Sequence, residues 1–138
     1  MEHFDVLVIG GGPGGYLCAE RAAQGGMTVA LFEAEHMGGT CLNEGCIPTK
    51  TLLNSVKLYR HATESSAFGV TAENVKLDHA AVLKRKGQVV KQLVTGVESA
   101  MKSHKINVIH PKISGEQEVE KVVSSTNDDG FIRTKIYF

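Results

Sequence analysis

The first 35 residues alternate between short apolar runs and an alanine-rich segment. Residues 4–10, "FDVLVIG", are apolar and β-branched and close on glycine, which predicts a buried parallel strand. Residues 14–24 are alanine-rich and stop at a pair of glycines, as a helix does. Residues 28–32 form a second apolar run. Strand, glycine turn, helix and strand in this order predict a βαβ unit.

The middle of the chain changes from apolar runs to helical spacing. Residues 40–57 favour a helix that is interrupted near Gly45 and Pro48, and residues 64–76 predict a loop with a short extended piece. Residues 78–103 predict a long amphipathic helix that presents one apolar face. That face is expected to contain Val82, Val90, Leu93, Val97 and Met101.

The last third returns to strand-like patterns. Residues 106–109, "INVI", predict a third parallel strand. Residues 119–125 and 131–138 flank the turn sequence "TNDDG", which predicts a β-hairpin. The fold class that follows is α/β, with a parallel Rossmann-like sheet, a long amphipathic helix and a C-terminal hairpin or meander.

The composition excludes some classes of protein but does not by itself assign a function. At 138 residues we expect one domain, and 15 basic against 15 acidic residues give no bias toward nucleic acid or a membrane surface. No apolar run is long enough to span a bilayer, and the pattern of the N-terminus leads us to expect no secretory leader. We therefore expect a cytoplasmic protein, in whose reducing surroundings structural disulfides are rare.

The glycine-rich turn after the first strand is the first candidate site. Residues 10–15, "GGGPGG", fit G-x-G-x-x-G, in which the first glycine allows the turn, the second admits a pyrophosphate and the third lets helix and strand pack. Glu33 closes the second strand at the distance where a carboxylate takes ribose hydroxyls. This arrangement predicts dinucleotide binding but does not distinguish FAD from NAD.

The second candidate site is the pair Cys41 and Cys46 in "GGTCLNEGCIPTK". The pair follows Glu33 closely, so it should start at the cofactor edge of the sheet, near a helix N-terminus that favours thiolates. In an ideal helix the two Cα atoms would be about 8.7 Å apart, too far for a disulfide, so a bond requires a distorted turn. A structural staple and half a metal site are the alternatives, and redox chemistry at the cofactor is the preferred interpretation. Cys18 is expected to be a small buried apolar residue.

Both motifs together resemble the FAD-dependent pyridine nucleotide–disulfide oxidoreductases. The sequences "DVLVIGGGPGGYLCAERAAQGGMTVALFE" and "GGTCLNEGCIPTK" are similar to those of the dihydrolipoyl dehydrogenases in particular. Glutathione and mercuric reductases more often carry valine where Leu42 and Ile47 stand here. The clear similarity covers about residues 4–70 and fades beyond residue 105.

The resemblance implies roles for individual residues. Cys46 would be the thiolate that lies against the flavin, and Cys41 would be the more accessible thiol that exchanges with the lipoyl disulfide. Lys50 would approach the N5 edge of the flavin, and Glu33 would bind the adenosine ribose. The full set of implied cofactor-binding residues is Gly10, Gly12, Pro13, Gly14, Gly15, Glu33, Ala34, Gly39, Thr40 and Lys50.

The resemblance also implies substrates, partners and missing parts. Dihydrolipoamide on a lipoyl domain of a 2-oxo acid dehydrogenase complex would be oxidised, NAD would be the final acceptor, and the full-length enzyme would be a homodimer. Residues 1–138 would then be the N-terminal part of the FAD-binding domain, without the NAD-binding and dimerisation domains. The alternatives are a glutathione- or mercuric-reductase-like member and a catalytically silent FAD-binding fragment.

The histidines receive no role at this point. "HPKISGE", residues 110–116, resembles the family's catalytic His-Pro…Glu motif, but its glutamate is one position too far and it follows the third strand. His110 and Pro111 also stand near a place where the family has a glycine close to the adenine, which puts that contact in doubt. The other five histidines are expected at the surface without partners: His3, His36, His61, His79 and His104.

Overall fold

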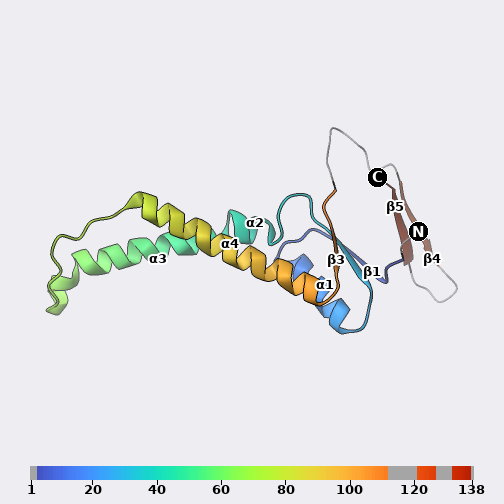
Figure 1. Ribbon diagram of the computed structural model, residues 1–138, viewed down its shortest axis with the longest axis horizontal. Helices are drawn as coiled ribbons and strands as arrows, with labels where there is room; N and C mark the ends of the chain where they lie inside the picture. The colour runs from blue at the N-terminus through green and yellow to red at the C-terminus, as the bar shows by residue number, and fades with distance from the viewer. Residues whose placement is uncertain (1–2, 112–120, 127–131, 138) are drawn as a thin grey trace.

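The computed structural model describes residues 3–111, 121–126 and 132–137. A three-stranded sheet with one layer of helices lies at one end, and two long helices extend from it (Figure 1). The elements are β1 (Val6–Ile9), α1 (Pro13–Gln24), β2 (Val29–Phe32), α2 (Gly39–Asn43), α3 (Cys46–Thr63), the 3₁₀ turn η1 (Ser65–Phe68), α4 (His79–Ser103), β3 (Asn107–Ile109), β4 (Lys121–Thr126) and β5 (Ile132–Tyr137).

The sheet confirms the three strands predicted from the apolar runs. Its order is β1-β2-β3 and both pairings are parallel, with Leu31 opposite Val8 on one side and Val108 on the other. The central strand β2 is buried along most of its length. The expectation that β1 is fully buried is wrong: it is an outer strand of this sheet, and Ile9 at its end is 79% exposed.

The core lies on one face of the sheet. Alternate residues of each strand point to the same side, where α1 and the end of α4 cover them. This core consists of Ala19, Val29, Leu31, Met37, Met101 and Ile106. Because Met37 lies just before α2, the core reaches the segment that leads to the cysteine pair.

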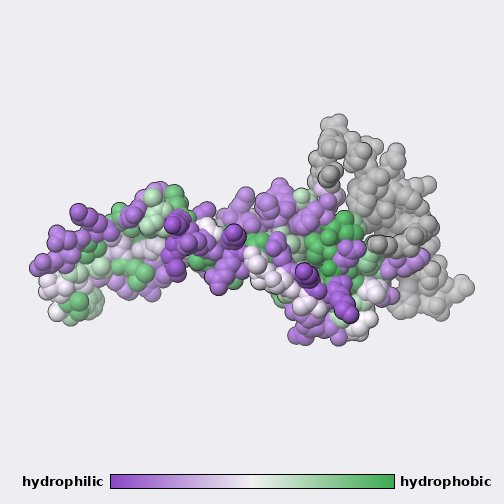
Figure 2. Space-filling model, in the orientation of Figure 1, coloured by the Kyte–Doolittle hydropathy of each residue, from purple (hydrophilic) through white to green (hydrophobic). Residues whose placement is uncertain are grey.

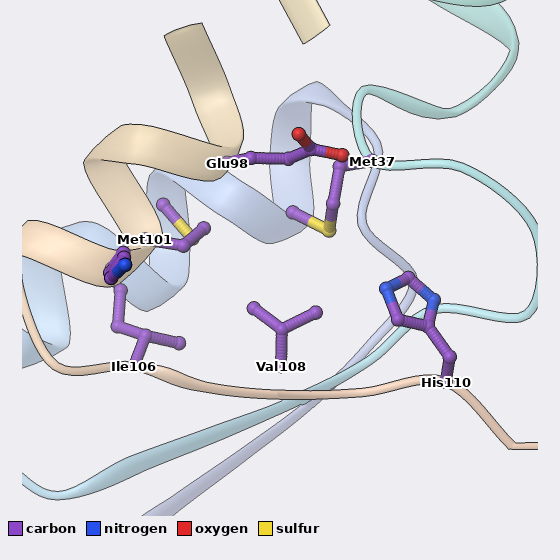
Figure 3. A pocket seen from close by; sticks show the side chains of 7 residues that line it. Met37, Glu98, Met101, Ile106, Val108 and His110 are labelled. Atoms are coloured by element: carbon purple, nitrogen blue, oxygen red, sulfur yellow. The ribbon is translucent and has the colours of Figure 1, made fainter. Parts of the chain in front are cut away.

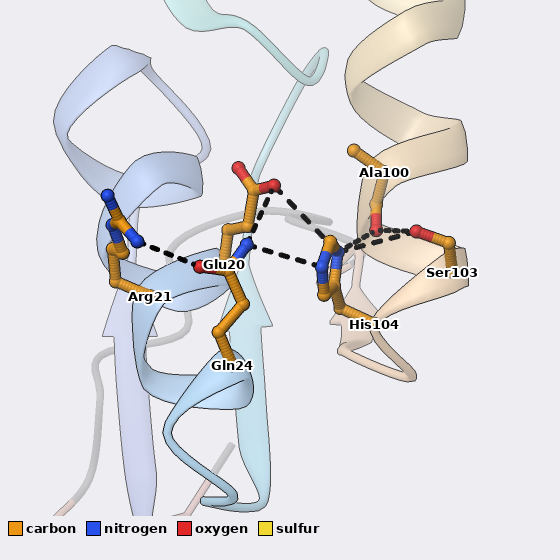
Figure 4. Close-up of polar contacts among 6 residues, drawn as sticks. All are labelled: Glu20, Arg21, Gln24, Ala100, Ser103 and His104. Atoms are coloured by element: carbon orange, nitrogen blue, oxygen red, sulfur yellow. Dashed lines mark hydrogen bonds and ion pairs between the residues drawn. The ribbon is translucent and has the colours of Figure 1, made fainter.

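Polar contacts join α1 to the C-terminus of α4 (Figure 4). His104 lies with Nε2 at 3.4 Å from the Gln24 amide nitrogen and with Nδ1 at 2.9 Å from the Ala100 carbonyl oxygen. The Glu20 carboxylate is 3.9 Å from the same Nδ1. The expectation that His104 has no partner is therefore wrong, because helix packing brings a turn of α1 beside it. Sequence spacing within α4 gives no sign of this contact.

The helix α3 lies antiparallel to α4 and in contact with it, and only the C-terminal end of α4 reaches the sheet (Figure 1). We call residues 46–93, which comprise α3, η1, the connection and the first part of α4, the helical arm. The Asp78 carboxylate caps α4 by accepting a hydrogen bond from the Ala81 N–H at 3.0 Å. Figure 2 shows apolar side chains scattered among polar ones along this arm.

Several predicted boundaries need correction. The cysteine-bearing helix is broken at residues 44 and 45 as expected, but α3 continues to Thr63, beyond the predicted end at residue 57. The loop predicted over 64–76 is confirmed, and within it the structure adds η1 and has no strand. On α4, Leu93 is 41% exposed and Val94 packs toward the core in its place. The hairpin is confirmed by the antiparallel pairing of β4 and β5.

Within the described ranges, no helix combines the length and the apolar character that crossing a membrane requires.

Candidate functional site

The glycine loop between β1 and α1 is held by close backbone packing. Gly10 has φ 97°, a conformation that favours glycine. A Cβ added to Gly15 would lie 1.8 Å from the Gly10 carbonyl oxygen, so only glycine lets α1 pass this close to the end of β1. These are the tight turn and the close helix–strand packing that the sequence motif predicts.

The same loop is open on its outer side. A Cβ added to Gly10, Gly12 or Gly14 would meet no atom within 4 Å. The helix α1 begins at Pro13, and the N–H groups of a first helical turn have no partner within the helix. The open backbone and the positive end of the helix dipole together fit a phosphate or pyrophosphate group.

The Glu33 carboxylate faces this loop from the end of β2. Its Oε2 accepts a hydrogen bond from the Gly11 N–H at 2.6 Å, and its Oε1 accepts one from the Glu35 N–H at 2.8 Å. A carboxylate oxygen can accept a second hydrogen bond, so both oxygens retain capacity for hydroxyl groups. Ala34 is exposed beside it. The loop and the acid thus fit the phosphate and ribose of a dinucleotide.

The segment before α2 touches the glycine loop directly. The Gly38 N–H donates to the Gly11 carbonyl oxygen at 2.8 Å. A Cβ on Gly39, which has φ 54°, would lie 2.9 Å from the Cα of Gly12. Cys41 follows two residues later, so the cysteine pair begins at the loop, as the topology argument predicts.

The break between α2 and α3 brings the two cysteines together. The Thr40 carbonyl accepts hydrogen bonds from the N–H groups of Glu44 at 2.9 Å and of Gly45 at 2.6 Å, which ends α2. Cys46 is then the first residue of α3, an 18-residue helix whose positive end favours negative charge at the sulfur. The distorted turn that a bond between the cysteines requires is therefore present. In this structure both cysteines are free thiols.

The two thiols interact through a hydrogen bond. A hydrogen bond with the Cys46 side chain, burial and the nearby Cys46 charge raise the pKa of Cys41, whereas the Cys46 backbone and the Lys50 ammonium group oppose the shift. Cys41 therefore holds its proton to higher pH than an ordinary thiol. Cys46 is exposed and Cys41 is only half-exposed, the reverse of the expected order.

Lys50 lies one helical turn beyond Cys46, as expected, and is exposed. It lines a cavity of about 230 Å³ between α3 and α4, together with Arg85 of the facing helix. Cys18 is exposed on α1, so its prediction as a buried residue is wrong: the core-facing position there is the neighbouring Ala19. Across the described residues, no three His, Cys, Asp or Glu side chains form a group that could hold a metal ion.

Sequence reasoning left His110 unassigned, and the structure places it at the site. It follows β3 at the same sheet edge, and its Nδ1 lies 2.9 Å from the Glu33 carbonyl oxygen. The ring also lines a cavity of about 270 Å³, in which it points toward Met37 (Figure 3). Two signals in the sequence pointed to it: its position directly after a predicted strand, and the resemblance that puts this stretch near the adenine.

Comparison with known proteins agrees with this geometry. Residues 4–132 match the profile of the family described as pyridine nucleotide-disulphide oxidoreductase. The chain belongs to the pyridine nucleotide-disulphide oxidoreductases. The resemblance drawn from the two motifs is thereby confirmed, and the family is one of oxidoreductases.

Two curated relatives of this chain carry the name dihydrolipoyl dehydrogenase. A dihydrolipoyl dehydrogenase of Bacillus subtilis is 50% identical over 76% of this chain and 22% of its own length. One of Zymomonas mobilis is 42% identical over 86% of this chain and 26% of its own. The chain therefore spans about a quarter of the length of these relatives.

A solved structure supports the fold. The HOCl-induced flavoprotein disulfide reductase RclA from Escherichia coli, solved as a Cu(II) complex, matches with a TM-score of 0.64 at 31% identity. The match covers 80% of this chain and 22% of that one. The Rossmann-like α/β fold predicted for the chain is confirmed.

Proposed function

We propose that the chain is the FAD-binding and redox-dithiol part of a dihydrolipoyl dehydrogenase. The contact between Gly38 and Gly11 carries this proposal, because it joins the cysteine-bearing segment to the loop that fits a dinucleotide. Residues 1–138 would form the first part of the FAD-binding domain, with NAD binding and dimerisation supplied by regions outside them. The names of the relatives support lipoamide over other disulfide substrates.

The residues of this chain fit FAD in three places. Gly10, Gly12, Pro13, Gly14 and Gly15 would surround the pyrophosphate, since the loop is open and precedes a helix N-terminus. At the second place, Glu33 would bind the ribose hydroxyls beside Ala34. At the third, Gly39, Thr40 and Lys50 would border the flavin end. Bound FAD would supply two-electron chemistry between the thiol pair and NAD.

The cysteines would perform a thiol–disulfide exchange with dihydrolipoamide. One substrate thiolate attacks the Cys41 sulfur of the oxidised pair, the bond between Cys41 and Cys46 breaks, and Cys46 leaves as a thiolate. The second substrate thiol then displaces Cys41 from the mixed disulfide and closes the lipoamide ring. Of the two substrate thiol protons, one is transferred to Cys41 and the other passes to solvent.

The raised pKa of Cys41 supports this division of roles. A thiol that keeps its proton can donate a hydrogen bond to its neighbour, so Cys41 suits the role of the protonated member of the reduced pair. The positive end of α3 acts in the same direction. The substrate would arrive on a lipoyl domain of a 2-oxo acid dehydrogenase complex, with a homodimer in the cytoplasm as the working enzyme.

The test is thiol exchange in the purified, oxidised chain. Dihydrolipoamide should release two protein thiols beyond those of untreated chain, counted with a chromogenic disulfide reagent. The variants Cys41→Ser and Cys46→Ser should show no increase. Cys18→Ser is the matched control, because Cys18 is exposed on α1 outside the pair, and it should retain the full increase.

Cofactor binding is tested separately by titrating FAD and recording flavin fluorescence. Saturable binding that Glu33→Ala weakens is expected. A chain that neither binds FAD nor exchanges with dihydrolipoamide would contradict the proposed function. Equal exchange with glutathione and dihydrolipoamide would contradict the lipoamide assignment alone.

A further inference from the structure

His110 occupies the place where the hydrogen bonds between β2 and β3 end. Leu31 lies opposite Val108, so Glu33 lies opposite His110 in the continued register. The Glu33 N–H donates to the Ile109 carbonyl oxygen at 3.0 Å, as the parallel pattern requires. In that pattern, the Glu33 carbonyl should accept the next hydrogen bond from the N–H of residue 111.

Residue 111 cannot make this bond, because it is a proline and has no backbone N–H. The His110 side chain stands in its place, with Nδ1 at 2.9 Å from the Glu33 carbonyl oxygen. A carbonyl oxygen only accepts, so Nδ1 must carry the hydrogen. The imidazole thus supplies the donor that the backbone lacks.

Glu33 is consequently fixed at four atoms. Its N–H and carbonyl are held from the β3 side by Ile109 and His110. Its two carboxylate oxygens are held by the N–H groups of Gly11 and Glu35. The backbone hydrogen bonds fix the position of the Glu33 main chain, and the other two fix the position of its carboxylate group.

We propose that His110 is a positioning residue for the adenosine end of the dinucleotide, because its hydrogen bond to the Glu33 carbonyl holds Glu33 against the glycine loop. This rests on the proposed FAD-binding function. The histidine acts through Glu33 and needs no contact with the ligand. The histidine–proline pair is thereby a local replacement for one backbone hydrogen bond of the sheet.

The first test compares FAD dissociation constants by flavin fluorescence. His110→Ala should raise the constant about two- to tenfold, the effect of one net hydrogen bond. His110→Asn, whose amide can donate from a similar position, should recover part of the affinity. His61→Ala, an exposed histidine on α3, is the matched control and should bind as the wild type does.

A second variant separates this role from a general loss of structure. Replacing Pro111 by alanine in the His110→Ala background restores a backbone N–H at residue 111, so it should recover affinity. If the double variant does not recover FAD affinity, or if His110→Ala binds FAD as tightly as the wild type, the inference is overturned. The proposed function would still stand in either case, as long as the wild type binds FAD. Absence of wild-type FAD binding would overturn both.

Nitrogen NMR of the chain without cofactor gives an independent readout. The His110 ring should be the Nδ1–H tautomer or doubly protonated, because only these forms donate to Glu33. A ring found as the Nε2–H tautomer would overturn the hydrogen bond itself, whatever the FAD affinities.

Discussion

The sheet end and the helical arm differ in how they are stabilised. At the sheet end, Leu31 and Met101 are almost completely buried, and β1, β2 and β3 all contribute to one core. In the arm, large apolar residues remain exposed although α3 and α4 lie together: Leu53, Val56, Leu58, Phe68, Val70, Leu77, Leu83 and Leu93. An amphipathic helix pair with no third layer can bury only the narrow strip between its members.

This difference explains where the candidate site lies. The glycine loop, Glu33 and His110 stand at the edge of the buried sheet, where packing fixes backbone positions. The cysteine pair lies at the junction, between α2, which touches the loop, and α3, which begins the arm. Groups that must keep a fixed geometry are therefore located at the better-packed end.

The largest effect is expected from truncating matched leucines in the two regions. Leu31→Ala should lower the free energy of unfolding by about 2–5 kcal/mol, because Leu31 is fully buried. Leu53→Ala in the arm, where the side chain is 61% exposed, should change it by about 0.5 kcal/mol or less. Urea denaturation followed by circular dichroism measures both. Equal losses would mean that the arm contributes to the core as strongly as the sheet does.

Two neighbouring glycines offer a narrower test within the sheet end. Gly15→Ala should cost about 1–3 kcal/mol, because the new Cβ would overlap the Gly10 carbonyl oxygen. Gly14→Ala meets no atom within 4 Å, so the helix should be unchanged or up to about 1 kcal/mol more stable. Thermal unfolding of both variants checks the contrast, and a destabilised Gly14→Ala would contradict it.

At the junction of α2 and α3, the pKa of Cys41 should respond to substitutions in α3. Cys46→Ala should lower the pKa of Cys41, since it removes the hydrogen bond and the charge that raise it. Lys50→Met should raise the pKa of Cys41 further, since the ammonium charge opposes the shift. The pH dependence of Cys41 alkylation, read by mass spectrometry, gives both midpoints. Lys57→Met is the control, and a midpoint insensitive to Cys46 would mean that the thiols do not interact.

The smallest effect concerns Asp5, which joins the starts of β1 and β2. Its Oδ2 accepts hydrogen bonds from the Thr28 hydroxyl at 2.7 Å and from the Thr28 N–H at 2.8 Å, and these lower the pKa of Asp5. A lowered folded-state pKa adds stability above the unfolded pKa, which is lost as the pH falls through the folded pKa. With Asp5→Asn, the free energy of unfolding should therefore fall slightly less steeply as the pH is lowered. An unchanged acid profile would contradict this linkage.

Local patterns in the sequence were sufficient for the elements near the site. The glycine spacing predicts the turn because the positive φ of Gly10 favours glycine and only glycine admits the close approach at Gly15. The break between α2 and α3 follows from Gly45 and Pro48, and the hairpin follows from its turn residues. Each of these features depends on residues close together in the chain.

What the sequence determined by itself was the order of elements, the glycine turn and the presence of a cysteine pair, because φ/ψ preferences and hydrophobic periodicity act over a few residues. Tertiary structure alone decided that His104 contacts α1, that Cys18 is exposed and that His110 bonds to Glu33. The last contact joins residues 77 positions apart, and no local preference encodes it. It arises only when β2 and β3 pair and Pro111 leaves a carbonyl without its backbone donor.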